Sequence, residues 1–232
     1  MRKLAVFVEG YSEMLFVERL IFEIAGTHNV IIEQQQIRGG RRVKRTMTIV
    51  KAASIATGQQ YYVLIVDCGG DSQVKTRIME EHKNLTQNGY FQIIGIRDVR
   101  PDFTYGQVPQ LEVGLLKYIK TSLIPVEFIL AVMEIESWFL AESTHFPRID
   151  PSITVSAIKA QLGFDPELDD LALRPNPTDD LNAAYMIGGK SYGKDQVKTT
   201  LDAIDYSYIY LELQYKIAYL ERLGVCIETF LS

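Results

Sequence analysis

Short apolar runs that end in an acidic residue constrain the fold of this 232-residue chain more than any other feature. Runs rich in Val, Ile, Leu and Phe are typical of parallel strands, which are covered by helices on both faces. Helix-forming segments separate successive runs, and this alternation predicts right-handed crossovers. The acids that follow the runs are Glu9, Asp67, Asp98, Glu134 and Glu136. The predicted fold class is therefore α/β, a mainly parallel, Rossmann-like sheet with helices on both faces.

The expected elements alternate along the first half of the chain. Strands are predicted at 3–9, 29–37, 61–66, 91–96 and 125–132. Helices are predicted at 12–25, 46–57, 72–87 and 106–121, and a long final helix over 195–204 and then 206–223. The segment 147–193 is rich in Pro, Asp, Asn and Gly, which indicates short helices and loops. We therefore expect an α/β core over residues 1–145 and a helical C-terminal extension over 146–232 packed on it.

Composition excludes several classes of protein. Hydrophobic residues make up 47% and charged residues 23%, as in ordinary globular proteins. No apolar run approaches the roughly 18 residues of a membrane span. Cys68 and Cys226 show no metal or disulfide spacing, so a reducing cytoplasm is the expected location. A net charge of −5 argues against a protein that coats nucleic acid without specificity.

Acids at strand ends predict a metal site. In an open α/β sheet the carboxyl ends of the strands line one crevice, where ligands bind. Several carboxylates gathered there repel one another, and a divalent cation relieves that repulsion. The predicted metal ligands are Glu9, Asp67, Asp71, Asp98 and Glu136.

Structural roles compete with metal binding at most of these acids. Glu9 lies before a predicted helix and would also favour its positive N-terminus. Asp71 is suited to cap the helix that follows it. Asp98 has arginine neighbours with which it would pair, whereas Asp67 ends an apolar strand and needs either a metal or a hydrogen-bonded partner. Glu134 and Glu136 share one side of an extended chain but point apart if a helix already begins there.

Two basic segments suit contact with phosphate. The first, IRGGRRVKR, contains Arg38, Arg41, Arg42, Lys44 and Arg45 around two glycines. It is either a solvated loop or a loop that follows a nucleic-acid backbone. The second, GGKSYGKD, contains Lys194, which would either stabilise developing charge or lie in an exposed loop.

Familiar cofactor and nucleophile motifs are missing from the sequence. It contains neither a complete P-loop motif GxxxxGK[ST] nor a GxGxxG turn, and without the latter a dinucleotide cofactor is not expected. The histidines at 28, 82 and 145 are scattered, and we assign them no role.

The segment FVEGYSEMLFVERL resembles the TOPRIM superfamily, the catalytic domain of topoisomerases, primases and OLD-type nucleases. That family carries a glutamate after its first strand, matched by Glu9, and a DxD motif after its third, whose first aspartate is matched by Asp67. Most of the chain resembles, more specifically, a small stand-alone TOPRIM-like bacterial family. The motifs that carry this resemblance are FVEGYSE, IRDVRP, MEIESWFLAE and YGKDQVKTTLDAID. Members are often encoded beside ABC-type ATPases in phage-defence operons. The second aspartate of DxD falls on Gly69, so Asp71 or Asp98 would have to substitute.

The resemblance implies Mg²⁺- or Mn²⁺-dependent cleavage of phosphodiester bonds in DNA or RNA, with an ABC-type ATPase as partner and no membrane. The implied catalytic residues are Glu9, Asp67, Glu134, Glu136 and Lys194. The departure at Gly69 favours an alternative, a non-catalytic nucleic-acid- or ATPase-binding subunit. A third hypothesis, a receiver domain phosphorylated on Asp67, lacks the paired acids after the first strand. The sequence leaves the oligomeric state open, a homo-oligomer included.

Overall fold

A computed structural model describes residues 1–39, 43–54, 58–70, 72–193 and 195–232. The chain forms two compact units. The sheet unit comprises residues 1–97, 109–130 and 219–232, and the helical unit comprises residues 98–108 and 131–218. This grouping differs from the predicted boundary at residue 145, because the C-terminal segment belongs to the sheet unit.

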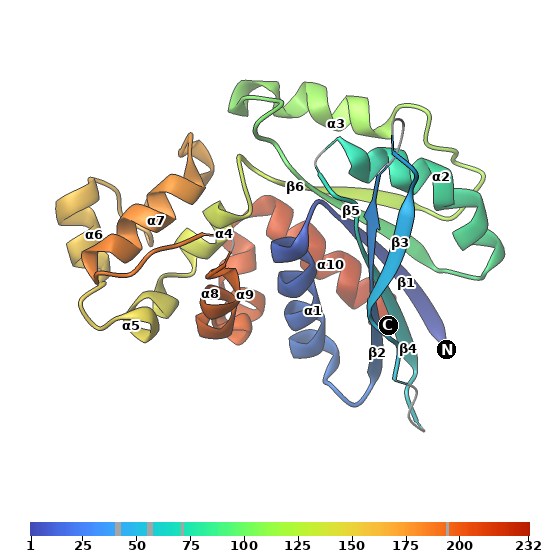
Figure 1. The fold of residues 1–232 in the computed structure, drawn as a ribbon, viewed down its shortest axis with the longest axis horizontal. Helices are drawn as coiled ribbons and strands as arrows, with labels where there is room; N and C mark the ends of the chain where they lie inside the picture. Colours follow the sequence, from blue (N-terminus) through green and yellow to red (C-terminus); the bar gives the residue numbers. More distant parts are fainter. Residues whose placement is uncertain (40–42, 55–57, 71, 194) are drawn as a thin grey trace. The chain divides into compact units, whose positions relative to one another are not determined.

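A single sheet carries the α/β fold (Figure 1). Its strands are β1 (Arg2–Val8), β2 (Val30–Arg38), β3 (Thr46–Lys51), β4 (Tyr61–Asp67), β5 (Gln92–Asp98) and β6 (Val126–Ala131). The strand order is β3-β2-β4-β1-β5-β6. Strand β1 pairs in parallel with β4 and β5, β2 pairs in parallel with β4, and β3 runs antiparallel to β2. The expectation of a mainly parallel sheet is confirmed.

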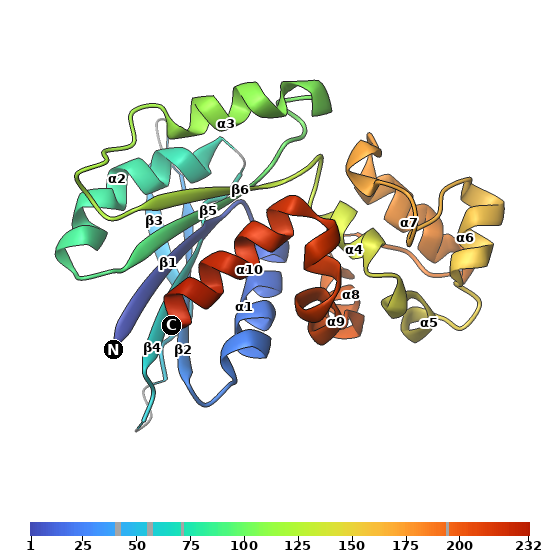
Figure 2. The same cartoon turned by 180° about the vertical axis from the view of Figure 1, so that it is seen from behind.

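Helices cover both faces of the sheet (Figures 1 and 2). Helices α1 (Tyr11–Ala25) and α10 (Ala218–Leu231) lie on one face, and α2 (Gln73–Gln87) and α3 (Val108–Leu116) lie on the other. On the first face the ring of Tyr61 lies 5.4 Å from that of Phe230 in α10. On the second face the packing is so close that a Cβ on Gly95 would lie 2.7 Å from Ile78 of α2. The central strand β1 is consequently buried from Leu4 to Val8.

The predicted helix at 46–57 is wrong. Residues Thr46–Lys51 form strand β3, and residues 55–57 lie outside the described part of the chain. The segment TMTIVK is rich in β-branched side chains, which suit a pleated strand better than a helix. All six of its residues are exposed, because β3 is the outermost strand on its side of the sheet.

The helical unit consists of short helices. They are η1 (Tyr105–Gln107), α4 (Glu136–Ala141), η2 (Ser143–His145), α5 (Phe146–Ile149), α6 (Val155–Leu162), η3 (Leu171–Leu173), α7 (Pro177–Ile187), α8 (Val197–Ala203), α9 (Tyr206–Leu211) and η4 (Leu213–Lys216). Within the described ranges no helix is long and apolar enough to cross a membrane.

Two predicted helices are shorter than expected. The helix expected at 106–121 ends at Leu116. The long final helix expected over 195–204 and 206–223 is divided into α8, α9, η4 and the beginning of α10. Ile217 has an extended backbone, with φ −127° and ψ 101°, which ends the preceding turn and lets α10 begin at Ala218. Several aromatic side chains of this segment are weak helix formers, which is consistent with its division into shorter helices.

Candidate functional site

The sheet unit brings Glu9 and Asp67 to the same edge of the sheet. Val8 and Asp67 are partners in the parallel pairing of β1 with β4, so Glu9 directly follows that pair. The backbone N–H groups of Gly69 and Gly70 donate to the carbonyl oxygen of Glu9 at 3.0 and 2.9 Å. Carboxyl ends of neighbouring parallel strands thus meet here, as in other open α/β sheets.

Glu9 does not supply the cap of helix α1. The backbone N–H of Gly10 donates to Oε2 of Glu13 at 3.0 Å, and Gly10 is the N-cap residue. Glu9 itself is 7% exposed and therefore nearly enclosed. The side-chain contact to the N-cap backbone is thus provided by Glu13.

The carboxylate of Asp67 is fully buried and accepts four hydrogen bonds. Oδ1 accepts from Nη1 of Arg38 at 2.8 Å and from the backbone N–H of Gly69 at 2.9 Å. Oδ2 accepts from Nη2 of Arg38 at 2.7 Å and from Nε2 of Gln36 at 3.0 Å. An ionised carboxylate offers about four acceptor sites, so these contacts fill it.

Arg38 is therefore the partner that a buried acid at position 67 requires. The two hydrogen bonds are parallel, which is the strongest geometry for an arginine and a carboxylate. The hydrogen bond to Asp67 raises the pKa of the Arg38 guanidinium, although partial burial acts in the opposite direction. Cys68, the next residue, is buried, and this burial raises the pKa of its thiol. Cys68 therefore stays neutral beside the ion pair.

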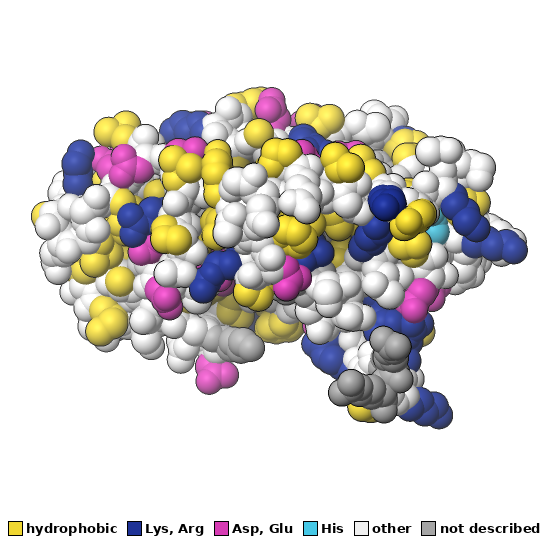
Figure 3. All heavy atoms as spheres, turned by 90° about the horizontal axis from the view of Figure 1, so that it is seen from above, with side chains coloured by type: hydrophobic (Ala, Val, Ile, Leu, Met, Phe, Trp, Pro, Cys, Tyr) yellow, Lys and Arg dark blue, Asp and Glu magenta, His cyan; other side chains and the backbone are white. Residues whose placement is uncertain are grey.

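The basic segment joins β2 to β3 and forms part of a β-hairpin. Arg38, Lys44 and Arg45 are exposed, and Arg41 and Arg42 lie outside the described residues. Figure 3 shows Lys and Arg side chains (dark blue) gathered at this end of the sheet unit. Arg45 pairs with Glu80 of α2 at 2.5 Å. Of the described basic residues, Arg38 thus ends β2, and Lys44 and Arg45 directly precede β3.

The acids predicted from MEIESW belong to the helical unit. Met133 has a left-handed backbone with φ 63°, and the turn that it forms is followed by α4, which begins at Glu136. The backbone N–H of Ile135 donates to Oδ1 of Asp98 at 3.0 Å. Asp98 therefore fixes the entry to α4, a structural role that the sequence did not indicate.

Glu134 and Glu136 have different partners. Oε1 of Glu134 accepts from Nη1 of Arg100 at 3.0 Å, and Oε2 accepts from the backbone N–H and hydroxyl of Thr178 at 2.9 and 2.8 Å. Thr178 lies in the first turn of α7, so Glu134 meets the positive end of that helix. Oε1 of Glu136 accepts instead from the hydroxyl of Tyr192 at 2.7 Å.

Burial raises the pKa of the Glu136 carboxyl, and the neighbouring Glu134 adds to this effect. Tyr192 opposes the shift by donating to the carboxylate, but a phenol brings no positive charge. Glu136 thus takes up a proton more readily than a solvent-exposed glutamate does.

Two predicted site residues, one metal ligand and one catalytic lysine, are not described by the structure. Asp71 and Lys194 lie outside the described residues. Among the residues that are described, no group of three or more His, Cys, Asp or Glu side chains is arranged to hold a metal ion. Glu9 and Asp67 belong to the sheet unit, and Asp98, Glu134 and Glu136 belong to the helical unit.

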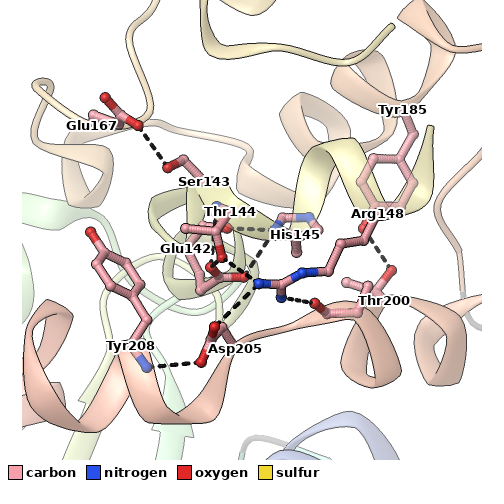
Figure 4. Close-up of polar contacts among 11 residues, drawn as sticks. Glu142, Ser143, Thr144, His145, Arg148, Glu167, Tyr185, Thr200, Asp205 and Tyr208 are labelled. Carbon is pink, nitrogen blue, oxygen red and sulfur yellow. Dashed lines mark hydrogen bonds and ion pairs between the residues drawn. The ribbon is translucent and has the colours of Figure 1, made fainter. Parts of the chain in front are cut away.

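A polar network in the helical unit was not predicted (Figure 4). Glu142 and His145 are fully buried, and Nδ1 of His145 lies 3.4 Å from Oε2 of Glu142. Oε1 of Glu142 accepts from the backbone N–H and the hydroxyl of Thr144. Arg148 extends the network by donating to Thr144 and to Asp205. A glutamate and a histidine three residues apart in a short helical turn were the only signal in the sequence.

Comparison with known proteins identifies no relative of this chain. No family model matches it, and neither the curated proteins nor the solved structures include a match.

Proposed function

We propose that this chain is a divalent-metal-dependent nuclease that hydrolyses phosphodiester bonds in DNA or RNA. The observation that carries the proposal is the placement of Glu9 and Asp67 at the ends of paired parallel strands. Oxygen ligands of this kind suit Mg²⁺ and Mn²⁺. The resemblance to TOPRIM nucleases, with an ABC-type ATPase as partner in phage defence, supports the same proposal.

The residues at this edge fit a cation only in part. Asp67 is buried, and a positive group already lies against both of its oxygens. A metal ion therefore requires Arg38 to move away, after which Glu9 and Asp67 would hold the ion. When bound, such an ion polarises a phosphate and activates a water molecule. Arg38, Lys44 and Arg45 would then contact the phosphates of the substrate.

Cleavage assays test the proposal. Purified protein is incubated with plasmid, linear DNA and tRNA in Mn²⁺, with and without the ATPase partner. The isosteric variants Glu9→Gln and Asp67→Asn should each lose about 100-fold or more of the cleavage rate, because each removes an anionic ligand. Glu23→Gln, which changes an exposed acid of α1, should keep it. Cleavage that survives in both site variants, or no cleavage under any condition, rejects the proposal.

A second candidate function is a non-catalytic subunit that binds nucleic acid or an ATPase. The specific observation in its favour is that Arg38, Gln36 and Gly69 together fill the acceptor sites of Asp67. Such a subunit would bind labelled oligonucleotides in EDTA, with an affinity that falls as salt rises. Binding in EDTA that is weakened by Lys44→Ala but unchanged by Asp67→Asn, without cleavage, would favour this candidate.

A further inference from the structure

The guanidinium of Arg38 occupies the position that a cation would take beside Asp67. The guanidinium donates to both carboxylate oxygens, at 2.8 and 2.7 Å. Gln36 and the backbone N–H of Gly69 donate the other two hydrogen bonds to Asp67. A metal ion cannot bind oxygens whose acceptor sites are all in use. Arg38 and a metal ion therefore compete for the same carboxylate.

The strand register and the glycine at position 69 leave room for this guanidinium. Gln36 and Asp67 are partners in the parallel pairing of β2 with β4, and Arg38 lies two residues further on the same face. Gly69 has a left-handed backbone with φ 78°, and a Cβ there would lie 3.2 Å from Nη1 of Arg38. Glycine at position 69 thus leaves the space into which the arginine fits.

The outer side of Arg38 is accessible. Its side chain is 46% exposed, whereas that of Asp67 is 0% exposed. A ligand can reach the guanidinium from solvent without first opening the sheet unit. Because Arg38 also lies on the basic hairpin, the ligand chemistry that suits it is a phosphate group.

We propose that Arg38 is a latch that keeps divalent metal from Asp67 until a phosphodiester group draws the guanidinium away. The inference rests on the proposed nuclease function and names how its site is regulated. A buried carboxylate without a partner is strongly disfavoured, so departure of Arg38 favours entry of a metal ion. Phosphate and metal should therefore bind cooperatively, and each should raise the affinity for the other by the same factor.

Calorimetric titration with Mn²⁺ tests the first half of the latch. Arg38→Met should bind Mn²⁺ about tenfold more tightly than the wild type, because the competing guanidinium is gone. The added affinity should disappear in the double variant Arg38→Met with Asp67→Asn. Arg222→Met is a matched control, since Arg222 is a half-exposed arginine that pairs with the part-exposed Glu112 and Glu127. It removes one positive charge and should leave Mn²⁺ affinity unchanged.

A second variant keeps the test valid if Arg38→Met folds poorly. Arg38→Lys retains a positive charge but cannot contact both oxygens in parallel, so it should fold and show intermediate Mn²⁺ affinity. Wild-type protein that binds Mn²⁺ through Asp67 as tightly as the Arg38 variants overturns the latch. Variants that gain no Mn²⁺ affinity also overturn it.

The second half of the latch concerns phosphate. Mn²⁺ affinity is measured at equal free Mn²⁺ with a phosphorothioate oligonucleotide, with inorganic phosphate, or with neither. The oligonucleotide should raise the affinity of the wild type about fivefold or more and leave Arg38→Met unchanged. An equal gain with inorganic phosphate supports the latch and assigns it to free phosphate. No gain with either ligand overturns the coupling.

Failure of the latch is distinguishable from failure of the nuclease proposal. Asp67-dependent cleavage by the wild type, together with unchanged Mn²⁺ affinity in Arg38→Met, rejects the latch and retains the nuclease. Tighter Mn²⁺ binding by Arg38→Met, with no cleavage by any variant, retains the latch and rejects the nuclease.

Discussion

The sheet unit and the helical unit both bury carboxylates, but they neutralise them differently. In the sheet unit a guanidinium with two parallel hydrogen bonds balances the charge of Asp67. In the helical unit the hydroxyl of Tyr192 donates to Glu136, and the ring of His145 lies beside Glu142. An arginine places a positive charge beside its partner, whereas a phenol adds no charge and burial raises the pKa of Glu136.

The difference teaches that the partner of a buried acid, more than its position at the end of a strand, decides what the acid can do. Arg38 donates to both oxygens of Asp67, so this carboxylate is available to a cation only by exchange. Burial raises the pKa of Glu136, which favours its protonated form. A single acidic pattern in the sequence thus leads to two chemically distinct groups.

Arg38→Met should have the strongest effect on stability, because it removes the only charged group among the donors to Asp67 that the structure describes. We expect a loss of about 2–3 kcal/mol in the free energy of unfolding, below the full cost of breaking a buried pair since Arg38 is half exposed. Urea denaturation measures this loss. Adding Asp67→Asn should recover part of it, and if the double variant is no more stable than Arg38→Met, the pair does not carry the effect.

Glu142→Ala tests the histidine-containing network of the helical unit. It removes an acceptor from Thr144 and leaves buried groups without their partner, so we expect a loss of about 1–3 kcal/mol in thermal or urea unfolding. Glu167→Ala changes an exposed acid that accepts from Ser143 in the same network, and it should cost less than about 0.5 kcal/mol. Equal losses in the two variants would show that burial of Glu142 is not what matters.

Thr178→Val tests the hydrogen bond from the Thr178 hydroxyl to Glu134. The valine lacks the hydroxyl that donates to Oε2, while the backbone N–H still does, so the expected loss is about 1 kcal/mol. Thr178→Ser restores the hydroxyl and should recover most of the stability. Chemical denaturation of both variants beside the wild type measures the difference.

Glu136→Gln should change stability the least, and at high pH it should raise stability, whereas the substitutions above lower it. The folded-state pKa of Glu136 lies above its usual value of 4.5, so its stabilising contribution is complete below that value and is lost as pH rises through the folded-state pKa. Glutamine stays neutral and still accepts from Tyr192. The variant should therefore melt slightly higher than the wild type at about pH 8 and equally at about pH 4. A lower melting temperature at the higher pH would contradict the raised pKa.

The sequence predicted the sheet better than it predicted the partners of the acids. Apolar runs located five of the strands, because burial on both faces leaves a local pattern. Strand β3 was missed, since its six residues are exposed and carry no such pattern. Asp67 was expected to need either a metal or a hydrogen-bonded partner, but the sequence did not identify Arg38, 29 positions away, as that partner. Pairing between distant side chains depends on strand register, which local composition does not encode.

Gly69 and Arg38 have a consequence for how this site can change by mutation. An acid introduced at position 69 would meet the Arg38 guanidinium and the carbonyl of Ile37, and the left-handed backbone there would strain any side chain. Its effect should therefore depend on whether Arg38 has already been replaced. The two positions are expected to be epistatic, because Arg38 occupies part of the space that a side chain at position 69 would need.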